Sequence, residues 1–214
     1  MRKGEGPLLD RRRTLGWGAA ALVMWPVGTR VTAQDAIGEV AEIAGSAAVI
    51  RAQEILVLSQ GDALFASDIV RTHADGRLLI RCRDGLRILV GSGTEVALRS
   101  YLADDGANRL RATIGLLRGI VRLIGAQRLR QPSIEVDTRT AVASVRSTDW
   151  LVESTPRGTG VLTLEGAVEV RGLAGGRVLV REGHGTDVPS GGQPTLPARW
   201  GETRRRDAIA RTSL

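Results

Sequence analysis

The sequence has few of the residue types that most often carry chemistry or bind nucleic acid. It contains one cysteine, two histidines and six aromatic residues in 214 positions, and its only lysine is Lys3. The single cysteine, Cys82, excludes an intramolecular disulfide. So few aromatic side chains argue against stacking platforms for nucleic-acid bases or sugars. Stability must therefore come from the packing of apolar side chains, which make up 43% of the sequence.

The scarcity of histidine and cysteine also limits metal binding and catalysis. His73 and His184 lie far apart, and neither His-x-x-x-His nor Cys-x-x-Cys occurs, so the usual zinc spacings are missing. Cys82 alternates with apolar residues, which predicts a buried and inert thiol. An enzymatic hypothesis would depend on His184, because glycines flank it and Asp187 could orient its ring. A solvated loop histidine is the more common case, so we expect no catalytic residue, no metal and no cofactor.

The net charge of +7 belongs mostly to the first 33 residues. This segment holds six of the 30 basic residues and two of the 23 acidic ones, so the remainder carries +3. The excess of positive charge therefore does not indicate a nucleic-acid partner. Instead, residues 1–33 combine a basic stretch at residues 11–13, an apolar run over residues 15–27 and small residues at 31–33, which is the pattern of an export signal.

The position of the arginines makes this signal similar to a twin-arginine signal, although Thr14 stands where such signals usually have Phe, so Sec export stays open. The apolar run is shorter than the roughly 20 residues that span a bilayer. We expect cleavage after Ala33 and a periplasmic or extracellular protein. An uncleaved leader that anchors the domain in the inner membrane is the alternative.

From Ile37 onward the sequence predicts an all-β domain. Short apolar or alternating runs are broken by Gly, Asp and Asn, as in a β-sandwich or jelly roll. Residues 77–83 and 86–90 are expected to form a hairpin with a type I′ turn at Asp84-Gly85 and with Leu78, Ile80 and Cys82 on one face. Further strands are expected at residues 94–100, 110–114, 119–124, 133–136, 140–146, 150–153, 160–164, 167–171 and 177–181. Residues 103–108 are expected to form a loop.

The composition changes near residue 188. We expect the β domain to occupy residues 37–188, and the glycines and prolines after it to mark a linker. Residues 189–214 are then a linker and polar tail, irregular or with one short helix.

Several motifs occur in the order found in the FecR domain, which is named for the iron-citrate sensory regulator. Gly61-Asp62 and Thr72 resemble the family's G-D-x-L…D-x-V-x-T segment. Asp84-Gly85 and Gly119 match the middle of the family pattern. Residues 145–152 are similar to the family's V-R-G-T-x-F-x-V, and residues 164–170 to its E-G-x-V-x-V. The family motif residues are Gly61, Asp62, Thr72, Asp84, Gly85, Gly119, Arg146, Thr148, Trp150, Glu165 and Gly166. The resemblance covers about residues 37–172 and implies structural roles for these residues.

Two features depart from the family pattern. Ser147 replaces the usual Gly, which would strain the backbone if φ is positive there, and Trp150 replaces the usual Phe. Only about 14 residues precede the apolar run, whereas signal-transducing relatives carry a cytosolic sigma-factor-binding segment there. The resemblance therefore implies the extracytoplasmic module without the anti-sigma role.

The arginines are the remaining candidates for interaction. Arg77, Arg81, Arg83 and Arg87 fall on the predicted hairpin and could bind carboxylates or phosphates, although outward arginines often only solvate a sheet. With His184 and Asp187 they complete the set of possible interaction residues. We expect a non-catalytic domain that binds or scaffolds another envelope protein or polymer, with residues 95–99 as a candidate edge strand for strand addition. A membrane-anchored sensory component related to iron-transport regulators is the alternative.

Overall fold

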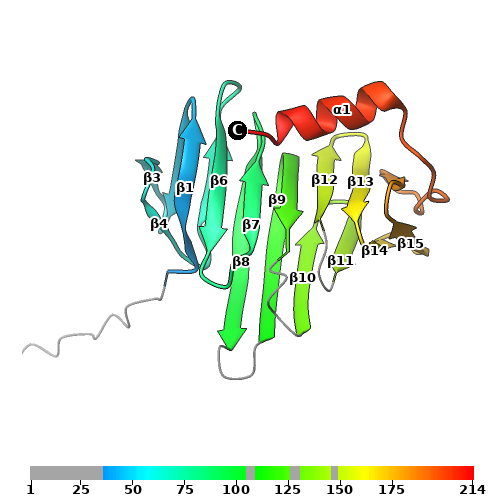
Figure 1. The fold of residues 1–214 in the computed structure, drawn as a ribbon, viewed down its shortest axis with the longest axis horizontal. Coiled ribbons are helices and arrows are strands. Elements are labelled where there is room, and N and C mark those ends of the chain that lie inside the picture. The colour runs from blue at the N-terminus through cyan, green and yellow to red at the C-terminus, as the bar shows by residue number, and fades with distance from the viewer. Residues whose placement is uncertain (1–35, 105–108, 126–130, 146–148) are drawn as a thin grey trace, which may run out of the picture. The chain divides into compact units, whose positions relative to one another are not determined.

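The computed structural model describes residues 36–104, 109–125, 131–145 and 149–214. Within these residues the chain forms sixteen β-strands and one short helix near the C-terminus (Figure 1). The expected all-β, sandwich-like fold is confirmed. Neighbouring strands are antiparallel except for one parallel pair, β9 with β10. Among the described residues, no helix has both the length and the apolar character needed to cross a membrane.

The strands form two sheets, which we call sheet A and sheet B. In order across sheet A they are β4 (Ala63–Leu64), β1 (Gly38–Ala44), β6 (Arg77–Cys82), β7 (Arg87–Val90), β9 (Arg109–Ile124), β12 (Asp149–Thr155), β13 (Gly158–Glu165) and β16 (Gly185–Pro189). Sheet B runs β3 (Glu54–Val57), β2 (Ala47–Arg51), β5 (Ile69–Thr72), β8 (Glu95–Asp104), β9, β10 (Gln131–Asp137), β11 (Ala141–Val145), β14 (Ala167–Gly172) and β15 (Arg177–Arg181).

Strand β9 belongs to both sheets and bends at Gly119. Its first ten residues pair with β8 in sheet B, and its last six pair with β12 in sheet A. Gly119 has φ +95°, a conformation that favours glycine. The Thr94 hydroxyl accepts a hydrogen bond from the Ile120 amide at 3.0 Å and donates to its carbonyl at 3.2 Å. Residues 110–114 and 119–124 are therefore parts of one strand, rather than the two separate strands that the pattern predicted.

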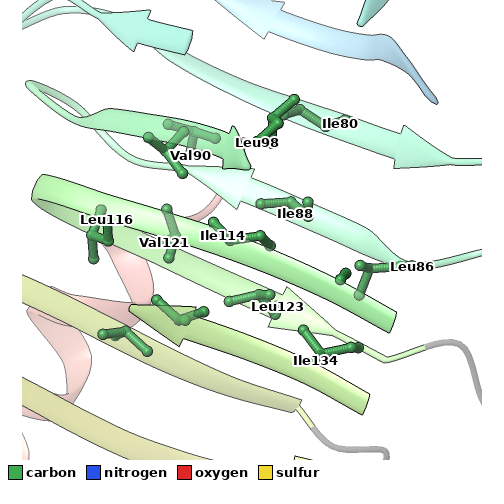
Figure 2. Close-up of a cluster of buried hydrophobic side chains, with 14 of the residues drawn as sticks. Ile80, Leu86, Ile88, Val90, Leu98, Ile114, Leu116, Val121, Leu123 and Ile134 are labelled. Atoms are coloured by element: carbon green, nitrogen blue, oxygen red, sulfur yellow. The ribbon is translucent and has the colours of Figure 1, made fainter. Parts of the chain in front are cut away.

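The hydrophobic core lies between the two sheets because their strands alternate apolar and polar residues. Leu78, Ile80 and Cys82 of β6 are all buried, as predicted from their spacing. Trp150 is fully buried in the same core and is the largest side chain there. Figure 2 shows part of this core, including Ile88 from sheet A and Ile134 from sheet B.

The hairpin between β6 and β7 is confirmed, but its turn differs from the predicted one. The Gly85 amide donates to the Cys82 carbonyl at 3.1 Å, and Gly85 has φ +88° whereas Asp84 does not have a positive φ. This is a three-residue connection, a tight turn followed by a left-handed glycine, rather than a two-residue type I′ turn. The Asp84 carboxylate stabilises this turn by accepting a hydrogen bond from the Leu86 amide at 3.0 Å.

Within residues 189–214, expected as a linker and polar tail, Trp200 and the helix that follows it pack on the outer face of sheet A. The helix α1 (Glu202–Arg211) buries Ala208 and, with Trp200, covers Ile120, Leu151 and Leu162. A Cβ at Gly185 would lie 2.7 Å from Cε2 of the Trp200 ring, so a glycine there lets the indole approach the sheet. The tail therefore completes the domain by covering an apolar surface of three strands.

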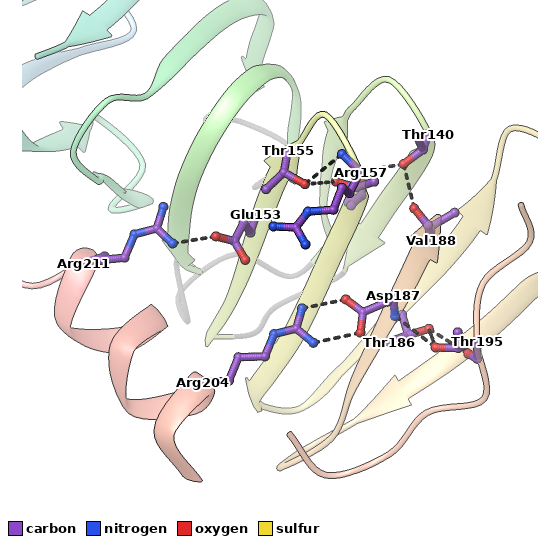
Figure 3. A network of polar contacts seen from close by, with 12 residues as sticks. Thr140, Glu153, Thr155, Arg157, Thr186, Asp187, Val188, Thr195, Arg204 and Arg211 are labelled. Atoms are coloured by element: carbon purple, nitrogen blue, oxygen red, sulfur yellow. Dashed lines mark hydrogen bonds and ion pairs between the residues drawn. The ribbon is translucent and has the colours of Figure 1, made fainter. Parts of the chain in front are cut away.

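Ion pairs tie the same helix to the sheet. Arg204 donates to both Asp187 carboxylate oxygens at 2.6 and 2.8 Å, and Arg211 bonds Glu153 at 2.5 Å (Figure 3). The Arg204 guanidinium also stacks on the Trp200 ring. The hydrogen bonds to Asp187 raise the pKa of the Arg204 guanidinium above its ordinary value.

Candidate functional site

Strand β3 is an edge strand whose outer backbone groups are available for pairing. Among the described residues it pairs only with β2, at the end of sheet B. The Leu58 amide donates to the Ala47 carbonyl at 3.0 Å, which sets the alternation of the antiparallel ladder. By that alternation Leu56 bonds β2, whereas the N–H and C=O groups of Ile55 and Val57 point away from it. These two residues therefore offer donors and acceptors to a further strand.

The side chains of β3 are apolar and exposed. The exposed fractions are 68% for Ile55, 42% for Leu56 and 82% for Val57. Ile55 lies opposite Ile50 on β2, and Ile50 lies opposite Ile69 on β5, so three isoleucines form one row on the outer face of sheet B. An apolar row that ends at a free edge fits the usual mode in which a sheet binds an extended peptide.

The turn before β3 holds its backbone in an unfavourable conformation. Ala52 and Gln53 form the two-residue connection between β2 and β3, and both have positive φ, at 48° and 70°. Such turns usually use Asn-Gly, because a side chain in the left-handed region costs about 1–2 kcal/mol per residue. Strain of this kind persists only where the surrounding structure holds it in place, and it is common at binding sites.

The hairpin is held by a partly buried ion pair at the end of β2. Arg51 donates to both oxygens of Asp68 at 2.8 and 2.7 Å and to the Ala63 carbonyl at 3.0 Å. Its guanidinium also lies 4.4 Å from the centre of the Phe65 ring. Asp68 is only 1% exposed, and the hydrogen bonds to its carboxylate raise the pKa of Arg51 above the ordinary value. This anchor fixes the base of the hairpin and leaves β3 as its free side.

The other strands at the sheet ends are less suited to accept a partner. Strand β4 has two residues, and β16 is already bonded by the tail through Ala198 and Thr195. Strand β15 presents the exposed charges of Arg177 and Arg181, which discourage pairing. Residues 95–99, predicted as an edge strand, lie in β8 between β5 and β9, so that prediction is wrong.

The predicted arginines lie on or beside the outer face of sheet A. Arg81 on β6 is directly opposite Arg87 on β7, and both are exposed, as is Arg83 in the turn between them. Arg77 instead donates to the carbonyls of Ala210 and Ser213 at the end of α1, at 3.4 and 3.1 Å. Three of the four arginines are therefore close in the structure, and the fourth supports the tail.

The structure does not pair His184 with Asp187. Asp187 lies in β16 rather than in the predicted loop, and both of its oxygens bond Arg204. The His184 ring nitrogen Nδ1 lies 3.0 Å from the Glu182 carbonyl. Sequence reasoning missed this outcome because Arg204 is 17 residues away along the chain. The hypothesis of a histidine oriented by Asp187 is therefore wrong.

The family motif residues that the structure describes take structural positions. Gly61, Gly85, Gly119 and Gly166 have positive φ at turns or at the bend of β9, and Glu165 is the exposed last residue of β13. Asp62 accepts a hydrogen bond from the Ser59 amide at 2.7 Å, and the Thr72 hydroxyl donates to the Gly91 carbonyl at 2.6 Å. Arg146 and Thr148, with Ser147, lie outside the described residues. The motif in this chain thus marks turns and buried contacts.

Two further features bear on chemistry. Burial raises the pKa of the Cys82 thiol from 9.0 to about 12, so the thiol is protonated at neutral pH. No group of three or more His, Cys, Asp or Glu side chains suited to a metal occurs within the part of the chain that the structure describes.

A shallow hollow of about 410 Å³ lies on the outer face of sheet B. It is lined by Ser133, Glu135, Ser144, Val145, Ala167, Glu169 and Leu179. The hollow is lined by side chains of β10, β11, β14 and β15, and its two carboxylates come from β10 and β14. The residues that line the hollow do not combine free backbone groups with an exposed apolar row, as those of β3 do. Strand β3 is therefore the stronger candidate site.

Sequence reasoning missed β3. The run Ile55-Leu56-Val57 is a short apolar segment, and periodicity alone does not distinguish a buried strand from an exposed edge strand. The only signal was the run of four consecutive apolar residues, Ile55 to Leu58, between Glu54 and a turn-rich segment.

Comparisons with known proteins support the fold. The model of the FecR protein family matches residues 68–169, which confirms the resemblance carried by the motifs. Two crystal structures of a candidate anti-sigma factor from Parabacteroides distasonis are similar, with TM-scores of 0.53 and 0.51 at 14% and 15% sequence identity. The aligned regions cover 66% and 65% of this chain and 64% and 62% of those chains, so the chain spans less than two thirds of their length. No curated protein matches the sequence.

Proposed function

We propose that this chain is a non-catalytic signal-transduction protein that acts by binding another protein, on the basis of the match of residues 68–169 to the FecR protein family. The coarse role is supported by this match and by the similar fold of a candidate anti-sigma factor. Strand β3 lies outside the matched residues, so the binding surface is argued from its own geometry.

The observation that carries the proposal is the free edge of β3. Ile55 and Val57 combine outward backbone groups with exposed apolar side chains, at 68% and 82%. A partner that adds one extended strand there would bond both residues and cover the isoleucine row. The partner segment should carry apolar side chains at alternate positions, because alternate residues of a strand face the same side. Binding of this kind needs no catalytic residue.

A crosslinking experiment in producing cells tests this surface. A photo-reactive residue at Val57 should crosslink one protein, whereas the same residue at Leu179, on the charged edge strand β15, should not. Ile55→Pro should abolish the crosslink, because proline removes an outward N–H without removing a bond to β2. Ile55→Pro should also weaken binding of the identified protein to the purified chain by about tenfold or more, as expected for a lost edge contact.

Any of four results would overturn the proposal, and the first three concern the crosslinked products. They are equal crosslinking at Val57 and Leu179, crosslinking unchanged by Ile55→Pro, and crosslinks to a glycan polymer instead of a protein. The absence of any crosslinked product at Val57 would count in the same way.

We also propose that the protein is exported. Residues 11–33 support this by their basic, apolar and small-residue order. The mass of the protein purified from its native cells should correspond to a chain that starts at Gln34. A mass that retains residues 1–33 would favour the anchored alternative and contradict cleavage.

A further inference from the structure

The outer face of sheet A has one part covered by helix α1. Beneath the helix lie Ile120, Leu151 and Leu162, which are fully buried. At the border of this apolar floor, the carboxylates of Glu153 and Asp187 bind arginines of α1. An apolar surface of sheet A, bordered by two carboxylates, therefore binds the arginine-rich helix α1.

A second apolar floor lies on the neighbouring strands β6 and β7. Leu79 lies opposite Leu89, and both are half-buried. Neither belongs to the core between the sheets or to the cluster beneath α1, as far as the described residues go. Two adjacent leucines on a sheet surface thus have no apolar layer over them in that part of the chain.

The end of this second floor that lies towards the turn between β6 and β7 is basic, whereas Glu42 of β1 lies opposite Leu79 at its side. Arg81 lies opposite Arg87, one row along from the leucines and on the same face, because residues two apart on a strand share a face. The hydrogen bond from Cys82 to Leu86 makes Arg81 and Arg87 a non-hydrogen-bonded pair, in which side chains approach most closely. Like charges opposite each other are unfavourable unless a counter-charge is near.

The described residues supply little negative charge to these arginines. Arg81 reaches Glu39 only at 3.5 Å, and both side chains are more than half exposed, at 57% and 52%. Arg83 and Arg87 form no ion pair with any residue that the structure describes. An acidic partner would supply the negative charge that these arginines lack.

We propose that Leu79, Leu89, Arg81, Arg83 and Arg87, which we call the β6–β7 face, bind an acidic amphipathic helix of a partner protein. The same sheet already binds a helix on its neighbouring strands, with the charges reversed. The helix α1 of a second copy does not fit, because its sequence Glu202–Arg211 contains four arginines and would meet like charge. The β6–β7 face is separate from β3, which lies in sheet B.

A titration with two synthetic helices tests the proposal. One labelled peptide of about five helical turns carries leucines on one face and glutamates on the other, and its twin replaces the glutamates with lysines. Fluorescence anisotropy should show micromolar binding of the acidic peptide to the purified protein and about tenfold weaker binding of the basic one. The double variant Arg81→Glu/Arg87→Glu should reverse this preference.

A matched pair of arginines provides the control. Arg171 and Arg177 also lie opposite each other and are exposed, but on sheet B beside Glu169 and Leu179. Arg171→Glu/Arg177→Glu should leave the binding of the acidic peptide unchanged. Ile55→Pro should also leave it unchanged, so the two proposed surfaces can fail independently.

Specific results would overturn the proposal. Equal binding of both peptides, no binding of the acidic peptide, or equal loss in the two double variants would contradict it. Sedimentation with phosphatidylglycerol vesicles adds a further test: vesicle binding that depends on Arg81 and Arg87, without peptide binding, would identify an anionic membrane instead of a helix.

Discussion

The bend of β9 at Gly119 makes a quantitative prediction about stability. Replacing this glycine with alanine introduces a Cβ into a conformation with φ +95° that side chains rarely adopt, at a cost of about 1–2 kcal/mol. That Cβ would also lie 2.6 Å from the Thr94 Cα, about 1 Å inside normal contact. This close contact can be removed only if Thr94 moves. That movement weakens the two hydrogen bonds between Thr94 and Ile120, each of which contributes about 1 kcal/mol. Overpacking adds about 1–3 kcal/mol.

Gly119→Ala should therefore lower the free energy of unfolding by about 4 kcal/mol or more, a large part of the stability of a typical domain. Gly93→Ala is the matched control, since Gly93 has φ +62° but no atom lies within 4 Å of its added Cβ. That variant should cost only about 1 kcal/mol. Urea denaturation followed by tryptophan fluorescence measures both values. Equal losses in the two variants would refute the close contact between Gly119 and Thr94.

Three further predictions concern other buried contacts. Trp200→Ala should lower the free energy of unfolding by about 3 kcal/mol, because the indole covers sheet A, whereas the exposed Arg199→Ala should change it little in urea denaturation. Asp68→Asn should cost about 2 kcal/mol or more by weakening the charge-assisted bonds from Arg51, and an unchanged urea midpoint would contradict that role. Burial favours the neutral Cys82 thiol and raises its pKa to about 12 in the folded protein. Its contribution to the free energy of unfolding is therefore complete below pH 9 and is lost as the pH rises towards about 12. The wild type should lose more stability than Cys82→Ala over that range.

The sequence was most informative where local rules determine the structure. The alternation of Leu78, Ile80 and Cys82 predicted a buried strand face, and Asp84-Gly85 predicted a hairpin, because both depend on neighbouring residues. The turn type was wrong because Asp84 accepts a hydrogen bond from Leu86 and leaves only Gly85 in the left-handed region.

Long-range pairing accounts for what the sequence did not predict. Strand β9 is continuous because β8 pairs with it up to Arg118, which no local pattern reveals. Asp187 bonds Arg204 only because the tail folds back over sheet A. The same limitation applies to the candidate site, since Ile55 and Val57 are exposed only because no described strand follows β3 in sheet B.

The proposed binding site depends most on the free edge of β3, and amide hydrogen exchange measures that edge directly. In the purified protein, the amides of Ile55 and Val57 should exchange rapidly, whereas the Leu56 amide, which bonds β2, should be protected. Addition of the protein partner crosslinked at Val57 should protect Ile55 and Val57. Protection of these two amides in the isolated protein, or rapid exchange of both in the complex, would contradict binding by strand addition.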